Sequence, residues 1–358
     1  MPNVLGKLPT ENRYLNRYRA DFLVHFHAIV KTCGEFTVAR SEENDETVLF
    51  PVDDREIPQL NFHRSRTGVS EEECRRLFES TVYTRSNHLP TKEFLLKSVD
   101  LGALRRDEVQ WVCCVNALYD LSLAGSPGTN LSLYAEKICI GGLIYIMVTK
   151  KSIPFRHSES RAHNGNSEHP YPKHRPVPSR TTNEVYDAFE RFMFTKDATP
   201  YNGIEALPEF LTLSKLTLGD ISILVKNNFN GMHKNSKVKI QFFDTDNQAN
   251  KSRKMFTAVR KAYFSNIGHL LLGGSSFSKF YQRCIDDKPG YMKTELHDVQ
   301  KLVVDDHYLE RNLILVYAFF KKVKKTFDMF PEVSGFYCTK ERSFGSEPSK
   351  SILFELAA

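Results

Sequence analysis

The chain has 358 residues, of which 41% are hydrophobic and 26% charged, a composition typical of folded proteins and not of disordered ones. Its net charge is +6, from 49 Lys and Arg against 43 Asp and Glu. The longest apolar run, Ile138 to Val148, is shorter than the roughly 18 residues that a membrane span requires. The N-terminus has no apolar segment behind a basic start. We therefore expect neither a membrane partner nor a signal peptide.

The seven cysteines are odd in number and contain no CxxC pair. Several lie in apolar sequence, such as VQWVCCVNALYDL. This pattern predicts reduced thiols in a cytosolic or nuclear protein. The four histidines between residues 153 and 183 lack the paired spacing of zinc ligands, so we predict neither a metal nor another cofactor.

The first 20 residues show no helical or strand period and are predicted to form an N-terminal arm. Residues 21–152 are expected to form an N-terminal lobe. Its first part is rich in β-branched and aromatic residues, which favours a small antiparallel hairpin. From Ser70 onward, acidic residues at the start of several segments indicate helices, and Leu131 to Val148 is interpreted as a buried helix.

Residues 153–183 are polar and hold five Lys or Arg against two Glu. We interpret this stretch as a basic hinge loop between two apolar halves. Residues 184–335 are predicted to form a helical C-terminal lobe, in which Val238 to Asp244 is the one expected strand, and residues 336–358 a C-terminal arm. The predicted fold class is mainly α: two helical lobes, a small antiparallel β element at the N-terminus and extended terminal arms.

The excess positive charge lies in the second half, where residues 151–358 hold 31 Lys and Arg against 23 Asp and Glu. A one-sided positive field favours a polyanionic partner, nucleic acid above all. The clearest basic segment, Asn250 to Tyr263, places cations seven residues apart on one helical face. An ordinary solvated helix face would give the same pattern. The predicted RNA-binding residues are Lys237, Lys239, Lys251, Arg253, Lys254, Arg260 and Lys261, with Arg161, Lys173, Arg175 and Arg180 from the hinge.

One short motif is enzyme-like. Asp244 and Asp246 follow an apolar strand and resemble the D-x-D of glycosyltransferases, in which the carboxylates hold a divalent cation on a nucleotide diphosphate. A turn before the next helix explains the same residues. A metal-dependent transferase is therefore kept as a remote alternative, and the chain is predicted not to be an enzyme.

The order of arm, lobe, basic hinge, basic helical lobe and arm resembles the nucleoproteins of negative-strand RNA viruses. This resemblance implies sequence-independent binding of single-stranded RNA in a basic cleft between two lobes, with phosphate contacts and stacking on aromatic side chains. It also implies a homo-oligomer joined through the terminal arms, a polymerase or phosphoprotein as further partner, and a location in the virion and host cytoplasm, with the nucleus as an alternative.

Two alternatives remain beside that interpretation. One is a self-assembling RNA-binding matrix protein of viral inclusion bodies. The other is a capsid or interaction protein that binds no nucleic acid.

Overall fold

The computed structural model describes the chain in several ranges. These are residues 4–24, 29–40, 47–52, 57–61, 91–100, 111–126, 129–140, 142–151, 190, 193–194, 209–242, 248–273, 294–304, 306, 308–340 and 351–356. Within this part of the chain, no helix is long and apolar enough to cross a membrane.

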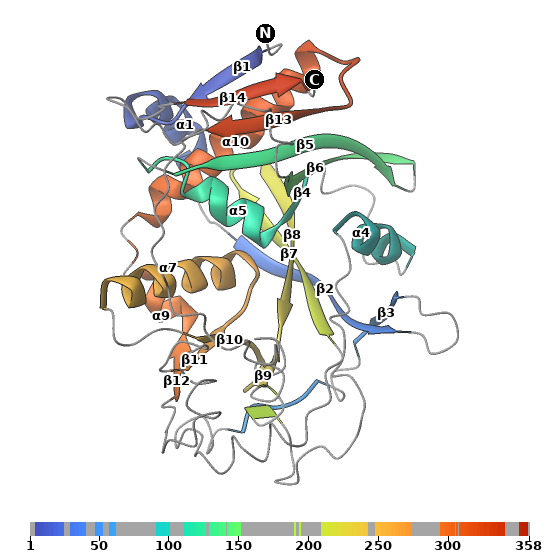
Figure 1. Ribbon diagram of the computed structural model, residues 1–358, viewed down its shortest axis with the longest axis vertical. Coiled ribbons are helices and arrows are strands. Elements are labelled where there is room, and N and C mark those ends of the chain that lie inside the picture. Colours follow the sequence, from blue (N-terminus) through green and yellow to red (C-terminus); the bar gives the residue numbers. More distant parts are fainter. Residues whose placement is uncertain are drawn as a thin grey trace, which may run out of the picture.

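A ten-stranded mixed sheet is the centre of the fold (Figure 1). Three neighbouring strands, β6, β4 and β8, run parallel, and the other neighbouring pairs are antiparallel. In spatial order the strands are β1 (Val4–Pro9), β14 (Ser351–Leu356), β13 (Gly335–Lys340), β5 (Leu131–Ile140), β6 (Leu143–Lys150), β4 (Trp111–Cys114), β8 (Ile221–Phe229), β7 (Glu209–Leu218), β2 (Ile29–Arg40) and β3 (Thr47–Pro51).

Helices pack beside this sheet. The largest hydrophobic cluster joins α10 (Leu309–Met329) and α5 (Val115–Ser122) to residues of β5, β8, β13 and β14. Helix α1 (Asn12–Val24) contacts α10. A second cluster lies under α4 (Thr91–Asp100), where the ring of Phe94 meets that of Phe36 edge to face at 5.4 Å.

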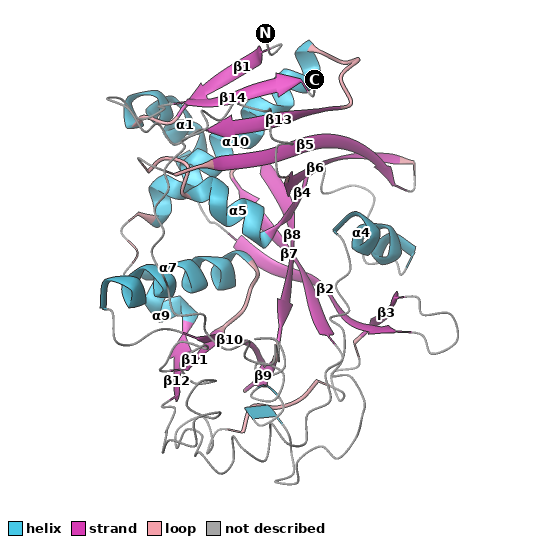
Figure 2. Cartoon of the chain, viewed as in Figure 1, coloured by secondary structure: helices cyan, strands magenta, loops and turns pink. Residues whose placement is uncertain are grey.

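A four-stranded sheet forms the other part of the fold, in the order β12 (Thr294–Asp298), β11 (His269–Gly273), β10 (Ser236–Phe242) and β9 (Gly231–His233). Helix α7 (Gln248–Phe264) and the short α9 (Val299–Val304) pack on it through Ala258, Val259 and Val299. Figure 2 shows this unit below α5, with α7 lying between α5 and the small sheet. Helix α7 also contacts α5.

The predicted mainly α fold class is wrong, because most of the described elements are strands. Strands from both sides of residues 153–183 share the large sheet, so two separate helical lobes are not formed. The segment Leu131 to Val148, interpreted as one helix, is the hairpin of β5 and β6. Segments at 209–218 and 221–229, taken as helices, form the hairpin of β7 and β8.

The cause of this error lies in the burial of the central strands. Phe210 to Ser214 in β7 are all buried, on both faces of the sheet. A strand that is covered on both sides shows no alternation of apolar and polar residues, and a short apolar run fits a buried helix equally well.

The predicted arms are ordered parts of this sheet. Residues 4–9 form β1 and pair with β14, which in turn pairs with β13. Both termini therefore meet at one edge of the molecule (Figure 1). The arms pair with each other within one chain, and their predicted role in oligomer formation stays a prediction. The predicted strand at 238–244 is confirmed by β10, and the predicted helix at 250–263 by α7.

Candidate phosphate-binding site

The three parallel strands place their carboxyl ends side by side. Cys114, the last residue of β4, pairs with Lys226 of β8, and Lys150 is the last residue of β6. In sheets with parallel strands, ligands commonly bind beyond the carboxyl ends, where side chains from neighbouring strands converge. Here that edge carries lysines.

Lys226 is 8% exposed although it carries an ammonium group. Its Nζ lies 5.2 Å from the centre of the Phe94 ring of α4, a distance that allows a cation–π contact. Burial lowers the pKa of Lys226, and interactions with Glu209, Cys114 and Glu93 act in the opposite direction. Since the net shift is downward, the surroundings compensate the cost of burying this charge only in part.

Lys239 approaches the same region from β10. Its Nζ donates a hydrogen bond of 2.7 Å to Oδ1 of Asn228, and Nδ2 of Asn228 in turn donates at 3.4 Å to Oε1 of Glu209. The pKa of Lys239 is lowered to about 8, mainly by burial and further by the positive charge of Lys261. The negative charges of Glu190 and Glu209 oppose this shift.

Lys261 of α7 and Lys150 complete the group. Nζ of Lys261 lies 5.1 Å from the ring centre of Tyr119, whose hydroxyl is 2.6 Å from Oγ1 of Thr257. Nζ of Lys150 forms an ion pair of 2.8 Å with Asp120 of α5. Burial lowers the pKa of Lys261, Asp120 opposes this and Lys150 adds to it.

We call Lys150, Lys226, Lys239 and Lys261 the lysine cluster. Glu93, Asp120, Glu190 and Glu209 accompany it, so that the formal charges of these described residues balance. Even so, the pKa of each of the three more buried lysines is lowered by burial. An anion such as a phosphate would compensate the remaining cost of burying these positive charges. A lysine with a pKa of about 8 can also give a proton to a leaving oxygen near neutral pH.

The structure brings two of the predicted RNA-binding residues, Lys239 and Lys261, into this cluster. Two others have structural partners. Lys237 is 5% exposed and its Nζ contacts Oε1 of Glu35 at 2.7 Å and Oγ1 of Thr32 at 2.6 Å, which ties the small sheet to β2. Arg260 is 7% exposed and its side chain reaches Asp306 in the segment before α10.

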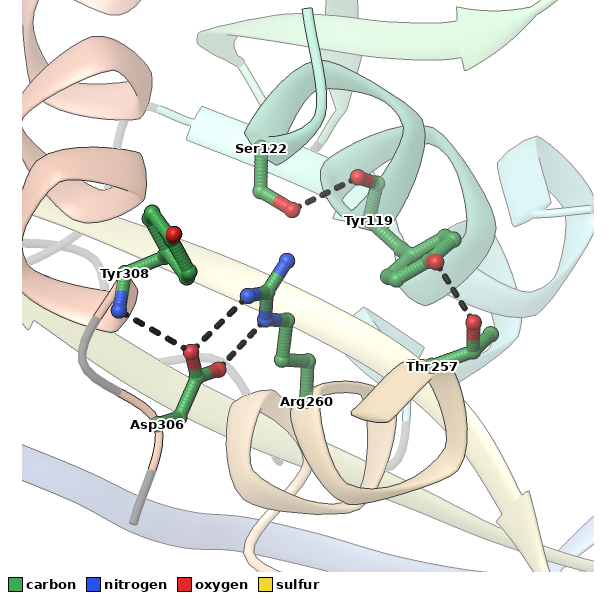
Figure 3. A network of polar contacts seen from close by, with 6 residues as sticks. All are labelled: Tyr119, Ser122, Thr257, Arg260, Asp306 and Tyr308. Carbon is green, nitrogen blue, oxygen red and sulfur yellow. Dashed lines mark hydrogen bonds and ion pairs between the residues drawn. The ribbon is translucent and has the colours of Figure 1, made fainter. Parts of the chain in front are cut away.

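Figure 3 shows the Arg260 network. Nε and Nη2 of Arg260 donate to the two carboxylate oxygens of Asp306 at 2.6 and 2.9 Å. Oδ1 of Asp306 also accepts the backbone N–H of Tyr308 at 3.1 Å, at the start of α10. These contacts make Arg260 a link between α7 and α10, and a direct RNA contact by its side chain stays a prediction.

The other predicted residues cannot be placed in this way. Lys251, Arg253 and Lys254 belong to α7, but their side chains lie outside the described residues. The four hinge residues Arg161, Lys173, Arg175 and Arg180 lie outside them altogether, as do Asp244 and Asp246.

Sequence reasoning missed Lys150 and Lys226. Lys226 is a single cation at the end of the apolar run ISILVK, and Lys150 is the first of two lysines after IYIMVT. For Lys226, the one lysine in a buried strand is the signal that was available, because a lysine is rarely buried without a partner or a function. Lys150 is exposed and gives no such signal.

No group of three or more His, Cys, Asp or Glu side chains that could hold a metal ion occurs within the described ranges. Around the cluster the carboxylates already face cations and amides: Asp120 is paired with Lys150, and Glu209 accepts from Asn228. These residues do not form a usual site for a divalent cation, which takes several oxygen ligands.

Comparison with solved structures identifies the fold. The chain is similar to Rai1 of Scheffersomyces stipitis in complex with (3'-NADP)+ and a calcium ion, with a TM-score of 0.61, 10% identity and coverage of 93% of this chain and 90% of that one. Candida albicans Rai1 in complex with pU5 and Mn2+ has a TM-score of 0.57 and 12% identity, with 92% and 89% covered. Dxo1 of K. lactis in complex with manganese has a TM-score of 0.54 and 10% identity, with 92% of this chain and 90% of that one covered.

No family model and no curated protein matches the sequence. At these identities the likeness establishes the fold, which is that of Rai1 and Dxo1.

This fold overturns several predictions. The resemblance to viral nucleoproteins is wrong, and with it the encapsidation of RNA, the viral alternatives and the location in the virion. The prediction that the chain is not an enzyme is contradicted as well, because the fold is that of Rai1 and Dxo1 and not that of a nucleoprotein.

Proposed function

We propose that this chain is an RNA-processing enzyme that binds the phosphate groups at an RNA end or on a nucleotide through its lysine cluster. The carrying observation is the convergence of four lysines from β6, β8, β10 and α7 where the three parallel strands end. Proteins with the same fold have been solved with pU5 and with (3'-NADP)+, which are phosphate-bearing ligands.

The parts of the cluster suit different tasks. Lys226 is fixed by its strand and by the Phe94 ring, and is suited to holding a phosphate in one place. Lys239 has a pKa lowered to about 8 and is suited to passing a proton to the oxygen that leaves. Lys150 is exposed and would add long-range attraction to the incoming polyanion.

The experiment uses pentauridylate with and without a 5′ phosphate. Binding is measured by fluorescence anisotropy, and products are separated by chromatography after incubation with Mn2+. The phosphorylated form should bind more tightly and be converted. Lys226→Met should weaken its binding about 10-fold to 100-fold, the range expected when a charge-assisted hydrogen bond is lost.

The matched control is Lys324→Met. Lys324 is a lysine of α10 whose exposed side chain pairs with Asp328 at 2.8 Å, so its loss removes the same charge from another surface. The proposal fails if the unaltered chain neither binds nor converts the phosphorylated oligonucleotide, or if Lys226→Met behaves like Lys324→Met.

A further inference from the structure

We propose that the lysine cluster itself neutralises the phosphate charge, so that this chain binds the phosphate end of RNA without a divalent cation. The inference rests on the function proposed above and goes further, because it assigns to four side chains the charge that a metal ion would otherwise supply.

Of the four carboxylates near the cluster among the described residues, three contact cations or amides of the chain. Asp120 is bound to Lys150 at 2.8 Å, Glu209 accepts from Asn228 at 3.4 Å, and Glu93 pairs with Lys97 one helical turn away at 3.7 Å. A divalent cation would have to displace these contacts before it gained a set of oxygen ligands.

The lysines would also repel such a cation. Lys239 and Lys261 are near enough for the charge of one to lower the pKa of the other, and Lys150 acts on Lys261 in the same way. A doubly charged ion among these groups would meet a stronger form of the same repulsion. A phosphate in the same place is attracted by every one of them.

Burial makes this attraction stronger. Lys226 is buried and Lys239 is half-buried, and burial is the main reason why their pKa values are lowered. Charges in a poorly solvated place interact more strongly than at the surface, and salt screens them less. A phosphate between these two ammonium groups would reverse part of the cost of burying them.

The test compares binding of 5′-phosphorylated pentauridylate by the full chain in excess EDTA and in Mn2+, again by anisotropy. We expect the Kd to change by less than about threefold between the two conditions. In EDTA, Lys226→Met and Lys239→Met should each weaken binding while Lys324→Met leaves it unchanged. Each lysine that neutralises a phosphate should contribute about 0.7 to the slope of log K against log salt.

The outcomes separate this inference from the proposed function. Binding in Mn2+ that disappears in EDTA would overturn the inference and leave the proposed function standing. Binding in EDTA that neither lysine variant weakens would place the phosphate elsewhere and overturn it too. Absence of binding in both conditions would instead overturn the proposed function. Circular dichroism of each variant shows that the fold is retained.

Discussion

Arg260 illustrates how a basic residue on an amphipathic helix can serve the fold. Its guanidinium and the carboxylate of Asp306 are 8% and 2% exposed and are joined by two hydrogen bonds. Asp306 in turn holds the backbone of Tyr308. The pair therefore fixes the start of α10, the helix that covers much of the large sheet.

We predict that Arg260→Met lowers the free energy of unfolding by about 3–5 kcal/mol, because it leaves the carboxylate of Asp306 buried without its partner. The double variant Arg260→Met, Asp306→Leu should recover most of the loss, since both charges are then removed. Urea denaturation followed by circular dichroism measures both values. An unchanged midpoint for the single variant would show that the pair is solvated in solution. Charge reversals on α7 that include Arg260 would therefore report unfolding as well as RNA binding.

Lys239 should make stability depend on pH. Its pKa falls from 10.5 to about 8 through burial, so between these values the unfolded chain holds more protons than the folded one. The free energy of unfolding contributed by this group therefore rises as the pH increases from 8 to 10.5. Below pH 8 the buried charge is present and its cost is fully felt.

We expect Lys239→Met to stabilise the chain at pH 7, and this advantage to shrink as the pH approaches 10.5. The measurement is a series of urea denaturations of the two proteins at several pH values. Lys324→Met, an exposed lysine variant, should show no comparable trend. A constant difference between Lys239→Met and the unaltered chain across the series would contradict the assigned shift.

At the scale of elements, the sequence holds signals for the hairpins that the helical interpretation overlooked. Ile140 pairs with Leu143 and Leu218 pairs with Ile221, so each hairpin has a two-residue loop. Gly142 and Gly219 in these loops have φ values of +80° and +58°. Gly-Gly and Gly-Asp between apolar runs are typical of such turns. These turn signals predict pairs of strands where helices were predicted.

The helix that was predicted at 250–263 has one covered face. Helix α7 packs Ala258, Val259 and Ala262 on the small sheet and shows the helical period in its sequence. Helix α10 ends at Met329, two residues before Pro331, because proline is disfavoured in the interior of a helix. Central strands such as β8 are buried on both faces and lack such a period.

At the scale of the whole molecule, the candidate site depends on contacts between distant segments. Lys150, Lys226, Lys239 and Lys261 come from two sheets and a helix, and their proximity follows from the order of the strands. Of these four lysines, the local sequence pattern predicted only Lys239 and Lys261 as RNA-binding residues. The pairing of β4 with both β6 and β8, which brings the site together, has no local signature.

The two ends of the chain are joined in one sheet edge, and this edge should be essential to stability. Strand β14 lies between β1 and β13, and its Phe354 is fully buried against Phe319 and Phe336. The neighbouring Leu353 is 36% exposed on the opposite face of the strand.

We predict that Phe354→Ala lowers the free energy of unfolding by about 3–5 kcal/mol, through the lost burial and the cavity left behind, whereas Leu353→Ala changes it by less than about 1 kcal/mol. Urea denaturation followed by circular dichroism compares the two variants with the unaltered chain. If the C-terminal segment instead served only to reach another subunit, Phe354→Ala would change the size of an assembly and leave the monomer's unfolding midpoint where it was. Light scattering on the same samples distinguishes these results, because loss of β14 packing acts within one chain and is independent of protein concentration.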